Sequence, residues 1–214
     1  MTKTVQFYFE FASPYSYLAS INIDDHVERA GGRVEWSPID LPKIWKAQGV
    51  LDAYLVIRAL KIPYIRQDAA RCAKLAGINL KSPSTPAIDT SIAKHAYWGL
   101  REVADDRAKP FLKCVWHRYF GEGLAITTIE DLAAAASPLG LDAGQITLLA
   151  AQPGSVARHD ASNDAAIANG CFGVPWFVSG EGRFFGHDRM SQMTDWLTVQ
   201  PSSPPFQASE DHAI

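Results

Sequence analysis

Two serines flank a proline where a strand-like run near the N-terminus ends, in Ser13-Pro14-Tyr15-Ser16. Cysteines at this spacing would form a thiol redox motif, but hydroxyls cannot form the mixed disulfide that thiol exchange requires. Ser13 is a favourable helix N-cap, and the unpaired N–H groups and dipole of the first turn stabilise an anion beside it. Ser13 is therefore either a cap alone or also a hydrogen-bond donor to a thiolate brought by a ligand. Ser16, one turn later, is interpreted as a packing or capping residue.

A second segment, Val174-Pro175, has a backbone that could bind an extended ligand. Pro175 opens a strand-like run, which is one of the places where a strand tolerates proline. A cis bond here would turn the backbone so that the N–H and C=O of Val174 could pair with a peptide-like ligand. Most prolines are trans, so the residues alone leave this alternative open.

A third segment, Gly186 to Arg189, combines backbone freedom with polar side chains. Gly186 allows close backbone approach, and His187 offers a polar ring. Asp188 either caps the helix that follows or pairs with the ammonium group of a ligand. Arg189 is equally consistent with a structural ion pair to a carboxylate.

The hydrophobic pattern predicts the elements that position these segments. Alternating apolar residues predict a strand at 5–11, followed by a helix at 15–30 and a second strand at 33–39. Near the other end, the pattern predicts a hairpin at 174–185 and a closing helix at 188–197. The intervening stretch is rich in helix formers and predicts helices at about 42–48, 64–76, 86–106, 109–120, 128–138, 142–150 and 155–169.

The order β-α-β, helical block, β-β-α predicts an α/β protein with a thioredoxin-like sheet. Residues 1–40 and 170–200 would form this discontinuous domain, and residues 41–169 an all-helical insertion. The tail, 201–214, is rich in proline and serine and is predicted to lie loosely on the surface. The competing topology is an α/β fold in which further strands go unrecognised.

The composition is that of an ordinary soluble globular protein, with 214 residues, 47% hydrophobic residues, 20% charged residues and a formal net charge of -3. This balance argues against a nucleic-acid partner. No run approaches the ~20 apolar residues of a membrane helix, and the N-terminus lacks a signal-peptide pattern. The sequence therefore predicts a cytoplasmic protein with no membrane association.

The cysteines and acidic residues predict neither disulfides nor a metal site. Cys72, Cys114 and Cys171 are odd in number and far apart, which predicts three buried free thiols. No paired Cys/His spacing indicates zinc, and residues 160–164 lack the glycine and glutamate of a calcium loop.

Four segments together resemble the 2-hydroxychromene-2-carboxylate isomerase family and its relatives, the kappa-class glutathione transferases, within the DsbA-like thioredoxin superfamily. They occur in the family's order and spacing, and the resemblance spans nearly the whole chain. It implies a DsbA-like thioredoxin fold and, because related enzymes are dimers, a homodimer. The segments are FYFEFASPYSYLA (7–19), KIPYIRQD (61–68), GCFGVPWFV (170–178) and FFGHDRM (184–190).

The resemblance also implies a glutathione site. Ser13 would be the catalytic serine that holds the glutathione sulfur as a thiolate, and Val174, before a cis-Pro175, would pair with the cysteinyl backbone. The γ-glutamyl end would lie at Gly186, His187, Asp188 and Arg189. The residues placed on the substrate side by the resemblance are Lys46, Lys61, Tyr64 and Pro83.

The implied reaction interconverts 2-hydroxychromene-2-carboxylate and trans-o-hydroxybenzylidenepyruvate, a step in the breakdown of naphthalene-type aromatic compounds. The chain departs from the family after WKAQG, where Val50 stands in place of a common ligand-contacting asparagine. This departure puts the exact substrate in doubt more than the use of glutathione. Two alternatives remain: a kappa-like transferase that conjugates electrophiles, and a non-enzymatic thiol- or peptide-binding module.

Overall fold

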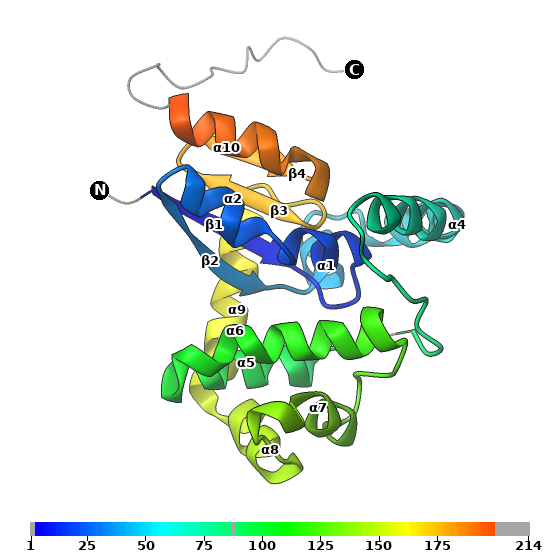
Figure 1. Cartoon of the computed structure of the whole chain (residues 1–214), viewed down its shortest axis with the longest axis vertical. Coiled ribbons are helices and arrows are strands. Elements are labelled where there is room, and N and C mark those ends of the chain that lie inside the picture. The colour runs from blue at the N-terminus through cyan, green and yellow to red at the C-terminus, as the bar shows by residue number, and fades with distance from the viewer. Residues whose placement is uncertain (1–2, 87–88, 200–214) are drawn as a thin grey trace.

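A computed structural model describes residues 3–86 and 89–199. The predicted loose tail at 201–214 lies outside the described residues. Residues 87 and 88, near the start of the helix predicted at 86–106, lie outside them as well. In Figure 1 the strands form one layer, α4 projects to one side, and α5 to α8 form a helical block at the end of the molecule opposite α10.

Four strands form the sheet in the order β2-β1-β3-β4. β1 (Lys3–Phe9) pairs parallel with β2 (Gly32–Pro38) and antiparallel with β3 (Trp176–Ser179), which pairs antiparallel with β4 (Gly182–Phe185). The helical insertion lies between β2 and β3, as predicted. The described residues contain no strand within this insertion, so the competing topology with unrecognised strands is wrong.

The helix predicted at 15–30 is two helices, α1 (Pro14–Ser20) and α2 (Ile23–Arg29). The break falls at Asn22, whose φ of -135° and ψ of 8° are not helical. Asparagine favours helix boundaries because its amide competes with the backbone for hydrogen bonds, and this preference outweighs the apolar spacing. The closing helix α10 (Met190–Val199) packs against α2 and β4 (Figure 1).

The predicted helices of the insertion are present, with altered boundaries. They are α3 (Leu41–Ala47), α4 (Leu51–Leu75), α5 (Ser91–Val103), α6 (Asp105–Trp116) with the π-helical turn η1 (His117–Glu122), α7 (Ile129–Ala136) with the 3-10 turn η2 (Ser137–Leu139), α8 (Ala143–Ala151) and α9 (Pro153–Ala168).

The prediction that a helix starts at residue 64 is wrong, because α4 begins at Leu51 and passes through Pro63. A proline inside a helix removes one N–H donor and usually ends or kinks it. Here Pro63 and Ala59, whose carbonyl loses its helical partner, are both exposed, so water can hydrate that carbonyl. Only Ala69 and Ala73 of α4 are buried.

The alternating residues of β1 supply two cores, one on each face of the sheet. Phe7 and Phe9 belong to a continuous cluster that includes α2 and α10 and extends into α5 to α8 through Trp116. Tyr8, on the opposite face, packs in a smaller cluster with Ile44 of α3. The sheet and the helical block therefore share one main core.

The three cysteines are free, as predicted. The prediction that all three are buried is wrong for Cys72 and Cys114, which are half-buried. Cys72 lies on α4, most of whose surface faces solvent. Only Cys171 is buried, and burial raises the pKa of its thiol to about 12.

Within the described ranges, no single helix is long and apolar enough to cross a membrane, and only the bent pair 129–139 with 143–151 passes that test jointly. No group of three or more potential metal-ligating His, Cys, Asp or Glu side chains occurs in the same ranges.

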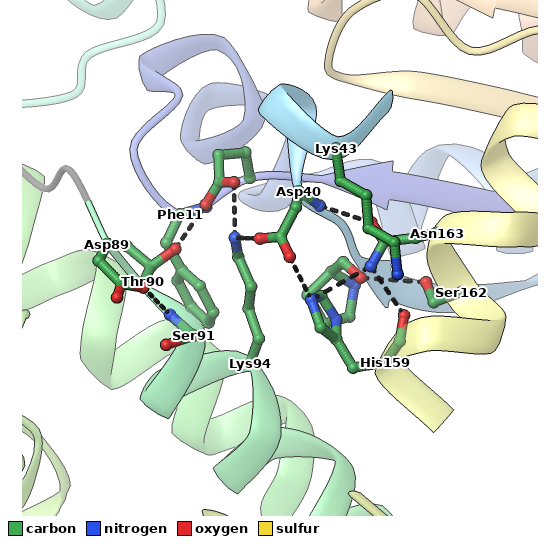
Figure 2. A network of polar contacts seen from close by, with 12 residues as sticks. Phe11, Asp40, Lys43, Asp89, Thr90, Ser91, Lys94, His159, Ser162 and Asn163 are labelled. Atoms are coloured by element: carbon green, nitrogen blue, oxygen red, sulfur yellow. Dashed lines mark hydrogen bonds and ion pairs between the residues drawn. The ribbon is translucent and has the colours of Figure 1, made fainter. Parts of the chain in front are cut away.

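A buried polar network joins the ends of β1 and β2 to α5 and α9 (Figure 2). The ammonium of Lys94, a residue only 2% exposed, forms ion pairs with Glu10 at 2.7 Å and with Asp40. The other Asp40 oxygen accepts from Nε2 of His159 at 2.9 Å, and the Asp40 N–H donates to the side-chain oxygen of Asn163 at 2.7 Å. The network ties the carboxyl ends of two strands to the helical block.

The charges in this network shift each other's titration. Burial alone would raise the pKa of the Asp40 carboxyl, but hydrogen bonds and charges from His159 and Lys94 bring it well below its ordinary value. Burial would lower the pKa of Lys94, but the Glu10 and Asp40 carboxylates outweigh this and raise it. The ionised Asp40 carboxylate and the protonated Lys94 ammonium are therefore favoured at neutral pH.

Acidification should remove the contribution of Asp40 to stability. A carboxyl whose folded pKa lies below its unfolded value of about 4 stabilises the fold fully above that value, and this stabilisation is lost as the pH falls through the folded pKa. Urea unfolding at pH 7, 4 and 3 should show that Asp40→Asn is less stable than the parent at pH 7 but loses less stability on acidification. Asp195→Asn, at an exposed position of α10, is the control and should follow the parent. Parallel pH curves for Asp40→Asn and the parent would contradict this prediction.

Candidate functional site

Ser13 caps α1, as predicted. Its Oγ accepts a hydrogen bond from the Ser16 N–H at 3.1 Å, and its own N–H donates to the Glu10 carbonyl at 3.0 Å. Because Oγ acts here as an acceptor, its hydroxyl hydrogen remains available to a ligand at the half-buried surface. Ser16 is fully buried, and its hydroxyl has no partner among the described residues, in agreement with a packing role.

The Val174–Pro175 peptide bond is cis, as the family resemblance implies. Within residues 3–86 and 89–199, neither the N–H nor the C=O of Val174 has a hydrogen-bond partner. The carbonyl of Pro175 accepts from the Gly186 N–H at 3.0 Å, which ties the cis proline to the third candidate segment. The two unpaired groups of Val174 are those that an extended ligand would engage.

The third segment forms the 3-10 turn η3 (His187–Arg189) after Gly186. The His187 ring stacks on the Tyr15 ring with centroids 5.2 Å apart and planes inclined by 10°, which places η3 beside the first turn of α1. Burial lowers the pKa of His187, so its imidazole is neutral near pH 7. The structure thus brings together the three predicted segments around the start of α1.

Gly186 is required by the backbone at this turn. Its φ is +101°, a region that L side chains rarely adopt, and an added Cβ would lie 2.6 Å from Oδ1 of Asp188.

Asp188 and Arg189 are exposed, and their charged groups are 3.7 Å apart. Asp188 lies within η3, before α10 begins, and no capping hydrogen bond from its side chain occurs in the described part of the chain. Its carboxylate is exposed and pairs loosely with Arg189, so a ligand can still reach it.

Asp68 and Arg71, on α4, also border the site, and their part in it was not predicted. Asp68 accepts a hydrogen bond from the Tyr15 hydroxyl at 2.8 Å and forms an ion pair with Arg71 at 2.7 Å. Hydrogen bonds from Arg71 and Tyr15 lower the pKa of Asp68, while burial and Asp68 raise that of Tyr15. The i,i+3 spacing of Asp68 and Arg71 is visible in the sequence, but nothing there pairs them with Tyr15.

The proposed substrate-side residues are spread over three elements. Lys46, on α3, and Lys61, on α4, are exposed and form no ion pair within the described residues. Tyr64 is 59% exposed and lies under the guanidinium of Arg71, 5.9 Å from it, next to the site. Pro83 is half-buried in the segment after α4. These four positions remain predictions.

Three contacts link the regions around Lys46 and Pro83 to the site. The indole N–H of Trp45, beside Lys46, donates to the Phe172 carbonyl at 3.0 Å, two residues before Val174. The segment containing Pro83 is held by a bond from the Lys81 N–H to the Phe120 carbonyl at 2.7 Å, and the Phe120 ring stacks on Tyr17 of α1. Lys61 has no comparable link among the described residues.

The fold and this site define a DsbA-type thioredoxin protein: the DSBA-like thioredoxin domain family matches residues 4–198, and the chain belongs to it. Within that class, the chain belongs to the 2-hydroxychromene-2-carboxylate isomerase family. The 2-hydroxychromene-2-carboxylate isomerase of Sphingobium xenophagum is 30% identical over 198 residues, covering 92% of this chain and 99% of that protein.

Two further similarities agree with this assignment. The solved structure of a 2-hydroxychromene-2-carboxylate isomerase matches with a TM-score of 0.77 and 26% identity, covering 91% of this chain and 94% of that chain. Glutathione s-transferase kappa 2 of Caenorhabditis elegans is 27% identical over 230 residues, covering 99% of this chain and 98% of that protein. The predicted family and DsbA-like fold are confirmed.

Proposed function

We propose that this protein is a glutathione-dependent isomerase that interconverts 2-hydroxychromene-2-carboxylate and trans-o-hydroxybenzylidenepyruvate in aromatic catabolism. The observation that carries the proposal is the capping geometry of Ser13, whose hydroxyl hydrogen is left for a ligand at the positive end of α1. The family membership supports the reaction class. Its members include the isomerase of Sphingobium xenophagum.

The residues around Ser13 fit a tripeptide thiol. The unpaired backbone groups of Val174 can accept and donate hydrogen bonds to a cysteinyl residue, as in the addition of a short strand. The exposed carboxylate of Asp188 can pair with the γ-glutamyl ammonium, and Gly186 leaves room for close backbone approach. Glutathione is therefore the proposed cofactor, with His187 and Arg189 beside its γ-glutamyl end.

When bound, glutathione would supply a thiolate that adds to the conjugated system of the substrate, so that the double bond becomes a rotatable single bond, and that leaves again after rotation, which restores the double bond and glutathione. The chain's own residues hold and orient the reactants. Ser13 would donate a hydrogen bond to the sulfur. This hydrogen bond and the dipole of α1 would both favour the ionised form of the thiol. Lys46 or Lys61 would hold the substrate carboxylate, and Tyr64 and Pro83 would line the substrate side.

Activity assays with one purified sample test the proposal. We expect turnover of the hydroxychromene carboxylate only when glutathione is added, with glutathione not consumed, and calorimetry should detect glutathione binding below millimolar concentration. Turnover without glutathione would refute the mechanism. Absence of binding at millimolar glutathione would instead favour a non-enzymatic thiol- or peptide-binding module.

A kappa-like transferase is the second candidate, favoured by the similarity to the Caenorhabditis elegans protein. Both activities would use the same thiolate at Ser13, and only the fate of the adduct differs. A generic aryl halide in the same assay separates them, because a transferase would consume glutathione and form a stable conjugate.

We also propose a homodimer in the cytoplasm. Support comes from the first half of α4, where four apolar side chains are 44–78% exposed on one projecting helix. Light scattering would measure the mass, and a monomer at micromolar concentration would contradict the dimer. The four residues are Leu55, Val56, Ile57 and Leu60.

A further inference from the structure

Glu10 holds the turn that leads to Ser13. One of its carboxylate oxygens accepts from the Phe11 N–H at 2.9 Å and from the Thr90 hydroxyl at 2.7 Å. Its main-chain carbonyl accepts from the Ser13 N–H at 3.0 Å. A buried carboxylate is thus attached directly to the backbone that positions the capping serine.

Lys94 is the cation that neutralises this carboxylate. Its side chain is 3% exposed, and its ammonium is 2.7 Å from the second oxygen of Glu10. The ammonium also contacts Asp40 (Figure 2). A buried charge without a partner is costly, and the Lys94 ammonium is the partner of both carboxylates. The family chemistry proposed above does not use these two residues.

We propose that Glu10 and Lys94 tune the charge of the sulfur held at Ser13, with the Lys94 ammonium favouring the thiolate and the Glu10 carboxylate opposing it. The inference rests on the proposed binding of glutathione. Neither side chain contacts Ser13 Oγ in the structure, so both are positioning residues that act through the turn and through their electric field.

The expected shift in the pKa of the bound thiol is large enough to measure because Glu10 and Lys94 are buried. Water and salt screen buried charges weakly, and a unit charge about 10 Å away at an effective dielectric constant of about 20 changes a pKa by about 1. The 3.0 Å hydrogen bond from the Ser13 N–H to the Glu10 carbonyl closes the turn between the two residues, which makes them neighbours on that length scale. Removing either charge alone should therefore shift the titration of a bound thiol, and removing both should largely restore it.

Other titratable groups near the start of α1 remain unchanged in this test. They are Asp68, Arg71 and Cys72 on α4, His187 and Asp188 on η3, and Tyr15 on α1 itself. On the side of Lys94 away from Glu10, Asp40 contacts the ammonium, and His159 contacts Asp40.

The experiment is a pH titration of glutathione bound to the intact protein, followed by the ultraviolet absorbance of the thiolate. Glu10→Gln keeps an amide oxygen for Phe11 and Thr90 but removes the charge, so the thiol pKa should fall by about 1. Lys94→Met should raise it by about 1, and the double variant should lie near the parent. Lys43→Met removes a lysine from the exposed ion pair with Asp160 and should leave the titration unchanged.

The opposite signs of the thiol pKa shifts expected in Glu10→Gln and Lys94→Met distinguish electrostatic tuning from a merely structural role. Loss of packing would disturb the site in both variants in the same direction, and this result would overturn the inference. An unchanged or raised pKa in Glu10→Gln would overturn it as well, even if Lys94→Met fails to fold. If the parent binds glutathione without a thiolate band, the proposed function itself fails, which is a separate outcome seen before any variant is made.

Discussion

Replacing Ser13 by alanine should lower turnover with glutathione by ~10²-fold or more, the usual effect of losing one oriented donor to a developing or stabilised anion. The Ser13 hydroxyl hydrogen is the donor, and Oγ is already engaged as acceptor for the Ser16 N–H. Steady-state rates at saturating glutathione measure the loss. The absorbance of the bound thiolate should show a raised thiol pKa in the same variant.

Two companion variants separate chemistry from capping. Removing a serine cap costs about 1 kcal/mol, so Ser13→Ala should also unfold slightly earlier. Ser13→Asp keeps a capping acceptor but has no donor and repels a thiolate, so it should be stable and inactive. Ser16→Ala, whose hydroxyl has no partner among the described residues, should retain turnover. Full activity in Ser13→Ala would refute the role of this hydroxyl.

Replacing Trp116 by alanine should reduce the free energy of unfolding by about 3–5 kcal/mol. Its fully buried ring lies 4.9 Å from that of Phe9 and 5.4 Å from that of Phe11, between the helical block and β1. Its indole N–H also donates to the Phe11 carbonyl at 3.2 Å. Since a domain is stable by only about 5–15 kcal/mol, this loss removes a large fraction of the total.

Urea unfolding followed by circular dichroism measures this effect. Because one core extends from the sheet into α5 to α8, we expect a single transition at lower urea, with sheet and helical block unfolding together. Trp98→Ala is the matched control, since Trp98 is only half-buried and should cost less. A loss under about 1 kcal/mol, or separate transitions for the two parts, would contradict the prediction.

The local features of the site could be predicted from sequence. Ser13 before Pro14 is a helix start whatever the rest of the chain does, because capping and the fixed φ of proline act within one turn. Likewise, the alternation in β1 and the glycine at 186 reflect local backbone requirements. The cis bond before Pro175 followed only from the family resemblance, since the residues alone leave both isomers open.

The tertiary structure decided what these local features meet. The sequence could not show that Pro63 is tolerated within α4, since the exposure of that helix depends on packing. Nor could it pair Asp68 with Tyr15, or Lys94 with Glu10 and Asp40, because these contacts span 53 to 84 residues of chain. By itself, then, the sequence determined the order of strands and helical block and the chemically suited residues, but not every helix boundary. The assembly of the buried charges depended on folding, because only burial makes a distant lysine and carboxylate obligatory partners.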